Sequence, residues 1–124
     1  MTISNTLSAR LADPSLLKTG GVIDGRWLEA SSAASTFDIT NPANGEVIAT
    51  LAEMGPKETQ AAIDAAYRAQ KAWAAQTGKE RAAVLRRLYD LMVANVDDLA
   101  TILTMEMGKP LAEAKGEIPN LAWL

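Results

Sequence analysis

Glu106 is the residue whose type and spacing point most directly to a binding site. It continues a helical row of apolar side chains formed by Leu99, Ile102 and Leu103, because residues three or four positions apart share one face of a helix. An ionised carboxylate in an apolar row is costly unless it has a partner. We therefore expect Glu106 to meet backbone N–H groups, a lysine or arginine, or a cation, or to lie exposed at the end of its helix.

Composition excludes several other kinds of site. The chain has no cysteine and no histidine, so a cysteine–histidine or serine–histidine nucleophile pair and a histidine metal site are ruled out. Neither G-x-G-x-x-G nor G-x-x-x-x-G-K-[ST] occurs, and these are the sequences that cradle dinucleotides and phosphates. No residue of this chain is therefore predicted to be catalytic or to bind a cofactor.

Two β-hairpins are predicted before the helices. In the second, residues 36–51, Phe37 and Ile39 alternate with polar residues, Pro42 fixes a bend, and Asn44-Gly45 tolerates positive φ. Asp24-Gly25 provides a similar tight-turn signal between the apolar stretches of residues 20–29. We therefore expect two short antiparallel hairpins.

Helices are predicted at residues 56–75, 78–94, 96–107 and 110–118. Thr77 and Glu80 have the spacing of a capping box, Gly108 suits a left-handed helix end, and Pro119 would remove a backbone donor and end the last helix. The first two helices each carry an apolar row that we expect to pack in a core. These rows are Ile63, Ala66, Tyr67, Trp73 and Ala74 in one helix, and Val84, Leu85, Leu88, Leu91 and Met92 in the other.

The predicted fold class is α+β, two short β-hairpins followed by about four helices. We divide the chain into a mobile N-terminal segment (1–12), a main region (13–118) and a divergent tail (119–124). The alternative for the first segment is a short amphipathic turn through Leu7, Leu11 and Leu16. In the tail, Leu121, Trp123 and Leu124 would leave apolar surface uncovered.

Charge and hydropathy exclude further classes of protein. The 124 residues are 48% hydrophobic with a net charge of −3, which is enough apolar sequence for one domain with a core. No basic stripe offsets the acidic balance, so nucleic acid is not an expected partner. No apolar run reaches the length of a membrane span, and the start of the chain lacks the features of a secretory signal. We expect a cytoplasmic protein with no membrane partner.

Several segments, in order, resemble the amino-terminal region of the aldehyde dehydrogenase superfamily, and among its members succinate-semialdehyde dehydrogenase most closely. They cover residues 13 to 118. The segments are Asp13-Pro14-Ser15-Leu16-Leu17, Ile23-Asp24-Gly25-Arg26-Trp27, residues 37–48, residues 79–87, and Glu106-Met107-Gly108-Lys109-Pro110-Leu111 with its continuation to Ile118.

The resemblance implies a fold, an activity and a metal site. The family fold is α/β, and this chain would be an incomplete part of it. Family members oxidise an aldehyde to an acid with NAD or NADP through a cysteine nucleophile, and they assemble as homodimers or tetramers. Their cysteine, general-base glutamate and cofactor-binding residues lie beyond position 124, so this chain is expected to be inactive alone and to bind no cofactor. The resemblance also implies a structural monovalent cation held by Glu106 and by backbone oxygens of Ile39 and Thr40.

Three functions remain open at this point. The chain is a fragment of a dehydrogenase, produced by a frameshift, a truncated reading frame or an artificial boundary near Pro119. Alternatively, it is a shortened, non-catalytic paralogue that binds or regulates the full-length enzyme. The third alternative is an unrelated helical interaction module, which would lack the hairpins.

Overall fold

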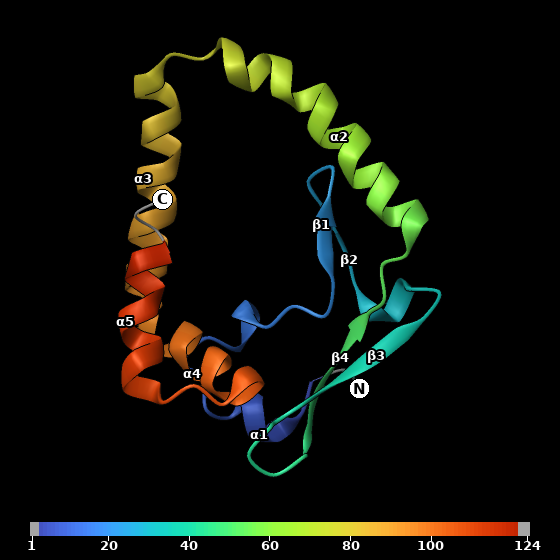
Figure 1. Cartoon of the computed structure of the whole chain (residues 1–124), viewed down its shortest axis with the longest axis vertical. Coiled ribbons are helices and arrows are strands. Elements are labelled where there is room, and N and C mark those ends of the chain that lie inside the picture. Colours follow the sequence, from blue (N-terminus) through green and yellow to red (C-terminus); the bar gives the residue numbers. More distant parts are fainter. Residues whose placement is uncertain (1–2, 122–124) are drawn as a thin grey trace.

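A computed structural model of the chain describes residues 3–121 and shows two separate two-stranded antiparallel sheets with helices after them (Figure 1). The elements in chain order are α1 (Asn5–Ser8), β1 (Gly21–Ile23), β2 (Arg26–Leu28), β3 (Thr36–Thr40), β4 (Val47–Ala52), α2 (Pro56–Ala75), α3 (Gly78–Ala94), α4 (Val96–Met107) and α5 (Leu111–Leu121), with 3₁₀ turns at Pro14–Leu16 and Ala30–Ser32. The α+β prediction is confirmed, and the two hairpins rule out the purely helical alternative.

The first hairpin turns where the sequence predicts. β1 pairs with β2 so that Val22 lies opposite Trp27. Asp24 and Gly25, the two residues between the strands, both have positive φ, 51° and 74°. This is the backbone that a two-residue hairpin turn needs, and aspartate followed by glycine adopts it readily.

The second hairpin has a wider turn than the Asn44-Gly45 pair alone. β3 and β4 pair with Phe37 opposite Leu51 and Ile39 opposite Ala49, and the register shifts after Ile39. The loop is closed by a hydrogen bond from the Asn41 N–H to the carbonyl of Glu46 (2.8 Å). Gly45 has a φ of 73°, as predicted, so the glycine provides the left-handed step inside this longer loop.

The N-terminal arm packs into the first of two small cores. Its Ser4 N–H donates to the carbonyl of Ile48 (2.9 Å), and α1 presents Leu7, which is only 1% exposed. Leu7, Ile48 and Met105 form this core. Of the amphipathic turn expected through Leu7, Leu11 and Leu16, α1 contains only Leu7; Leu11 is also buried but follows the helix, and Leu16 lies in the separate 3₁₀ turn.

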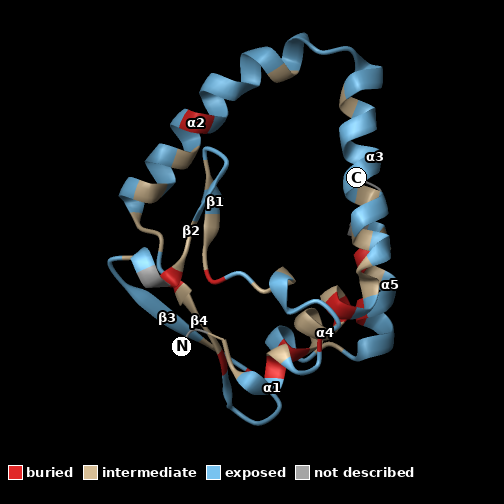
Figure 2. Ribbon diagram, turned by 180° about the vertical axis from the view of Figure 1, so that it is seen from behind, coloured by how far each residue is buried: buried red, intermediate tan, exposed pale blue. Residues whose placement is uncertain are grey.

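The second core lies between α4 and α5. It contains Ala100, Ala114 and Ile118, and α5 also lies beside α3 (Figures 1 and 2). The prediction that the last helix ends before Pro119 is wrong, because α5 continues to Leu121 with Pro119 inside it. Proline removes one backbone hydrogen bond, but the preceding turn is anchored by buried Ile118, and tertiary packing outweighs local propensity.

The apolar rows of α2 and α3 do not form a core with the described residues. Tyr67 is 83% exposed, and α3 has no buried residue at all among those described. Instead α2 packs its small residue Ala65 against the first hairpin, because a narrow two-stranded tip fits against alanine and leaves the larger side chains outside. Within residues 3–121 the prediction of core packing is therefore wrong for most of both rows, although Met92, the last residue of the α3 row, is partly buried against the core of Ala100, Ala114 and Ile118.

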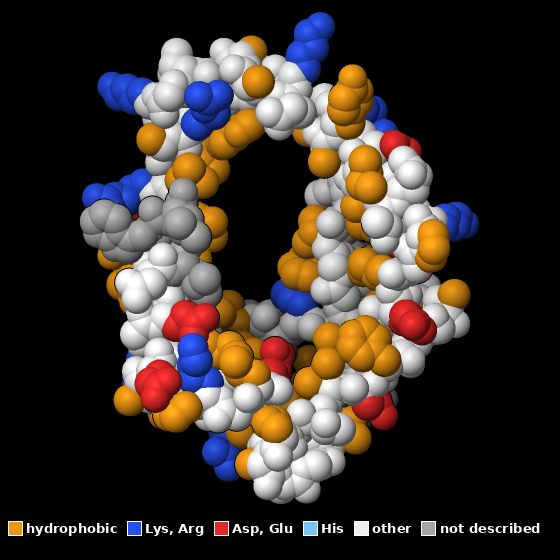
Figure 3. Space-filling model, viewed as in Figure 1, with side chains coloured by type: hydrophobic (Ala, Val, Ile, Leu, Met, Phe, Trp, Pro, Cys, Tyr) orange, Lys and Arg blue, Asp and Glu red, His pale blue; other side chains and the backbone are white. Residues whose placement is uncertain are grey.

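These helices form an arch around an opening. α2 and α3 run from the hairpins to α5 (Figure 1), are largely exposed (Figure 2), and border an opening flanked by hydrophobic side chains (Figure 3). Within the described part of the chain, no helix is both long enough and apolar enough to cross a lipid bilayer.

The helix-end signals predicted at Thr77 and Gly108 are confirmed. The Thr77 hydroxyl accepts from the Glu80 N–H (3.3 Å), and the Glu80 carboxylate accepts from the Thr77 N–H (2.7 Å). The Thr77 N–H is the larger cause of a lowered pKa for the Glu80 carboxyl, and the Thr77 hydroxyl, which also donates to that carboxylate (2.8 Å), is the second. The helix α4 stops at Gly108, which has a φ of 75°.

Candidate functional site at the junction of β3 and α4

The loop after β3 is fastened to α4 by Asn41. Its side-chain oxygen accepts from the Ala43 N–H (2.9 Å), and its main-chain oxygen accepts from the Gly45 N–H (2.8 Å). The side-chain amide of Asn41 then donates to the sulfur of Met105 in α4 (3.7 Å). Asn41 is only 9% exposed, so one buried amide both shapes the loop and holds it against the helix.

The residue that ends α4 lies against the same loop. Gly108 is in the left-handed conformation, and a Cβ atom placed on it would lie 3.0 Å from Cγ of Pro42. Both the backbone angle and the close approach of the proline ring favour glycine at this position. The end of β3 and the C-terminal turn of α4 are therefore in direct contact.

The three predicted cation ligands belong to the two elements that meet at this junction, β3 and α4. Ile39 packs against the first core and Thr40 ends β3, while Glu106 follows directly after Met105, which contacts the loop. The Glu106 side chain is exposed at the edge of the helix, yet partial burial of its carboxylate raises its pKa. None of the hydrogen bonds or ion pairs found among residues 3–121 involves this carboxylate.

The chemistry of these groups suits an oxygen-binding cation. One carboxylate and two main-chain oxygens are hard ligands of the kind that alkali and alkaline-earth cations prefer. Within residues 3–121, no group of three or more aspartate, glutamate, histidine or cysteine side chains is placed to hold a metal ion. A cation at this junction would therefore depend on main-chain oxygens beside Glu106.

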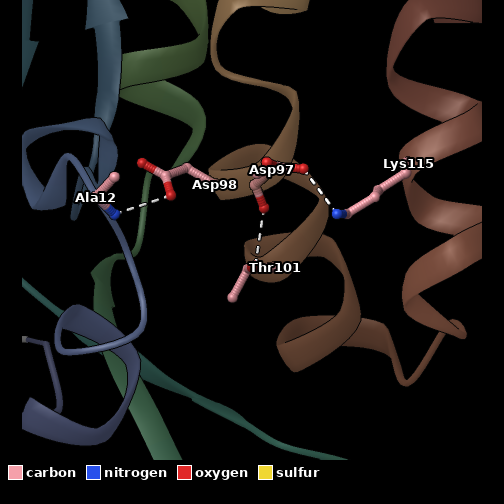
Figure 4. Close-up of polar contacts among 5 residues, drawn as sticks. All are labelled: Ala12, Asp97, Asp98, Thr101 and Lys115. Carbon is pink, nitrogen blue, oxygen red and sulfur yellow. Dashed lines mark hydrogen bonds and ion pairs between the residues drawn. The ribbon is translucent and has the colours of Figure 1, made fainter.

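A second polar contact fixes the N-terminal arm, and the sequence analysis did not identify it. Asp98 is buried in α4, and its carboxylate oxygens accept from the N–H groups of Ala12 (2.9 Å) and Asp13 (2.8 Å). Its neighbour Asp97 points the other way, to the ammonium of Lys115 in α5 (2.7 Å; Figure 4). The sequence does carry one signal for this contact: Asp98 lies seven residues before Met105, so the two side chains are on the same face of α4.

Composition limits the chemistry that is available at this junction. They contain no thiol, no imidazole and no glycine-rich phosphate loop, which are the groups that would attack an aldehyde or hold a dinucleotide. The polar groups at the β3–α4 junction bind backbone and position segments. The arrangement holds a loop against a helix end, and its carboxylate and main-chain oxygens are of the kind that bind a cation.

Comparison with known proteins identifies a family for most of the chain. A family model described as "Aldehyde dehydrogenase family" matches residues 27–123. The matched range includes Pro119.

Individual relatives agree with this match. The chain is 51% identical over 113 residues to a succinate-semialdehyde dehydrogenase [NADP(+)] of Escherichia coli, and 53% identical over 113 residues to a glutarate-semialdehyde dehydrogenase of Pseudomonas putida. Each alignment covers 91% of this chain and 23% of the relative. The crystal structure of succinate-semialdehyde dehydrogenase from Burkholderia pseudomallei superposes on 90% of this chain with a TM-score of 0.84 and 53% identity, again over 23% of its own length.

Proposed function

Since this chain belongs to the aldehyde dehydrogenase family, we propose that it supplies the amino-terminal part of an NAD- or NADP-dependent enzyme that oxidises a short semialdehyde to a carboxylic acid. The observation that carries this proposal is the superposition on a succinate-semialdehyde dehydrogenase, with a TM-score of 0.84 at 53% identity. Relatives named for succinate semialdehyde and glutarate semialdehyde support a substrate with a second, carboxylate end.

In this proposal the chain has a structural role and no chemical one. It lacks a thiol to attack the aldehyde and a loop to hold the cofactor phosphates. The remaining part of the enzyme would provide both, and the chain alone would not oxidise aldehydes. The fact that it spans 23% of the relatives' length agrees with this division.

The exposed apolar row of α3 is the surface that we propose packs on that remaining part. Leu85, Leu88 and Leu91 are each more than half exposed, and hydrophobic side chains flank the opening of the arch (Figure 3). Burying a leucine side chain contributes about 1.5–3 kcal/mol. Burial of these side chains would therefore favour association with a complementary polypeptide.

We also propose that Glu106, with backbone oxygens of Ile39 and Thr40, holds a structural monovalent cation at the β3–α4 junction. Two observations support this site: the Glu106 carboxylate has no hydrogen-bond or ion-pair partner among residues 3–121, and burial raises its pKa. Potassium chloride should raise the melting temperature of the parent chain more than choline chloride at the same ionic strength. The difference should vanish in Glu106→Gln, and an equal response to both salts would contradict the site.

The catalytic proposal is tested by complementation. The purified chain, mixed with succinate semialdehyde and NAD or NADP, should give no reduced cofactor above a buffer blank. Co-expression with the Escherichia coli relative lacking its matching segment should restore turnover. Turnover by the chain alone, or failure of the two parts to associate, would overturn the proposal.

Two matched variants on α3 test whether its apolar row contacts the remaining part of the enzyme. Leu88→Glu places a charge in the apolar row and should abolish complementation, whereas Arg87→Glu changes the neighbouring residue outside that row and should preserve it. A non-catalytic regulatory subunit would use the same exposed row, but would change the activity of an intact relative when added to it. Complementation without any such effect on the intact enzyme favours the role as an enzyme part.

A further inference from the structure

The Asn44-Gly45 pair lies in the exposed loop at the end of the β3–β4 hairpin (Figure 1). A Cβ atom placed on Gly45 would meet no atom within 4 Å outside its two chain neighbours. A glycine carries no side chain that would shield its main-chain nitrogen. This nitrogen can therefore approach the side-chain amide of Asn44, the residue before it in the chain.

Asn44 differs in this respect from the other asparagines. The chain has five, and Asn44 is the only one followed by glycine. Asn41 is buried and is followed by proline, whose nitrogen carries no hydrogen. Asn95 is followed by a β-branched valine, which crowds the next nitrogen, and Asn5 and Asn120 are held within the helices α1 and α5. A reaction between an asparagine side chain and the following nitrogen should therefore occur first at Asn44.

A hydrogen bond holds the Asn44 side chain folded back toward the main chain. Its Oδ1 accepts from the Glu46 N–H (3.0 Å), which is the arrangement of an Asx turn. The ring closed by this bond contains both the side-chain carbonyl carbon of Asn44 and the nitrogen of Gly45. An N–H donor also stabilises the negative charge that develops on a carbonyl oxygen under attack. The Glu46 N–H therefore both positions and activates the Asn44 amide.

One contact of the loop opposes this reaction. The Gly45 N–H donates to the main-chain oxygen of Asn41 (2.8 Å), and the nitrogen has to lose that proton before it can act as a nucleophile. The bond lies in an exposed loop, where hydrogen bonds open locally at low free-energy cost. The fold should therefore slow the reaction without preventing it.

We propose that Asn44 is a site of spontaneous covalent modification through a succinimide. The Gly45 nitrogen loses its proton and attacks the side-chain carbonyl carbon of Asn44, a new C–N bond forms, and the amide nitrogen leaves as ammonia, which carries that proton away. Water then opens the five-membered ring at one of its two carbonyl carbons. Opening at the side-chain carbonyl gives aspartate, and opening at the main-chain carbonyl gives isoaspartate. Nothing is oxidised or reduced, and either product adds one negative charge.

The two products should differ in their effect on the fold. Aspartate leaves the main chain unchanged, and its carboxylate can accept the Glu46 N–H as the amide does. Isoaspartate adds a methylene group to the main chain, inside a loop that is closed by the bond from the Asn41 N–H to the Glu46 oxygen (2.8 Å). The Glu46 carboxylate also accepts from the Thr6 hydroxyl of α1 (3.0 Å). Isoaspartate at position 44 should therefore loosen the N-terminal arm from the hairpin.

Peptide mapping by mass spectrometry tests this site in the full 124-residue chain, kept at mildly alkaline pH and compared with the same chain denatured in guanidinium chloride. The rate at Asn44 in the folded chain should lie within about a hundredfold of the rate in the denatured chain, equivalent to an opening free energy of about 2.7 kcal/mol or less. Aspartate and isoaspartate should both appear at this position. A slower reaction at Asn44, an equal rate at Asn95, or aspartate as the sole product would overturn the proposal.

Two variants separate the reaction from its consequence. Asn44→Gln keeps an amide but cannot close a five-membered ring, so it should remain unmodified. Asn44→Asp supplies the aspartate product from the start and should melt as the parent does. The isoaspartate form of the aged chain, separated by chromatography, should melt at a lower temperature than Asn44→Asp and should be cleaved faster by trypsin after Arg10. Modification of Asn44→Gln at the parent rate would refute the succinimide, and equal melting of the isoaspartate form and Asn44→Asp would refute the effect on the arm.

Discussion

Removing the Asp98 carboxylate should destabilise the chain far more than removing the neighbouring Asp97 carboxylate. Asp98 accepts two backbone N–H groups, at 2.9 and 2.8 Å, and is 7% exposed. Each hydrogen bond to a charged group contributes roughly 1.5–3 kcal/mol. D98A leaves both N–H groups without their acceptor, so we expect a loss of about 3 kcal/mol or more in the free energy of unfolding.

Two further variants should lower the free energy of unfolding by smaller amounts. D98N keeps one carbonyl acceptor and should lose about 1–2 kcal/mol. D97N removes only the ion pair with Lys115, in which the Asp97 side chain is 77% exposed, so about 0–1 kcal/mol is expected.

Urea titration followed by circular dichroism measures these three differences. Trypsin provides a local check, because release of the arm should speed cleavage after Arg10 in D98A but not in D97N. If D98A and D97N unfold within about 0.5 kcal/mol of each other, the two N–H groups are satisfied in another way and the reasoning fails.

Three other predictions follow from helix ends and from Glu106. Burial raises the pKa of Glu106, so its ionised form destabilises the fold above that raised pKa and has no effect below the ordinary carboxyl range. In choline buffer, Glu106→Gln should therefore become more stable than the parent chain as the pH rises. A difference in melting temperature that stays constant across pH would contradict this. Thr77→Ala should lower the free energy of unfolding, measured by urea titration, by about 1 kcal/mol, because it removes the N-cap acceptor of α3. An unchanged urea midpoint would show that water replaces the cap. Gly108→Ala should cost about 1–3 kcal/mol, since it strains a left-handed residue and approaches Pro42. Gly116→Ala, inside α5 with open space around it, should instead raise the free energy of unfolding by about 0.5–1 kcal/mol. If both substitutions changed the free energy of unfolding in the same direction, the different roles assigned to Gly108 and Gly116 would be refuted.

Local signals in the sequence predicted the elements well. Asp24-Gly25, the Thr77–Glu80 box and Gly108 each act through bonds within a few residues, and all three are found in the structure. Side chains that depend on distant segments were predicted less well. Leu7 was expected in a mobile segment or a short turn, but it lies in the core because Ile48 and Met105 meet it there.

The apolar rows of α2 and α3 show a different reason for failure. Their spacing indicates a buried face, yet Tyr67 and Leu88 are exposed among the described residues. A periodic pattern reveals that a face is made for burial, but it does not identify what covers it. At the candidate site, Glu106 was noticeable as a charge in an apolar row, whereas Asp98 resembled an ordinary first-turn acid until its backbone partners were seen.

The placement of α4 between two small cores has a consequence for how the chain opens. Met105 belongs to the core shared with the hairpin and the arm, and Ala100 to the core shared with α5. Amide hydrogens of α4 should therefore exchange with solvent only when both cores come apart, whereas those of α2, with Ala65 as its one buried residue, should exchange through local opening. Hydrogen exchange would then resolve two cooperative units in one short chain, a slowly exchanging unit around α4 and a rapidly exchanging arch.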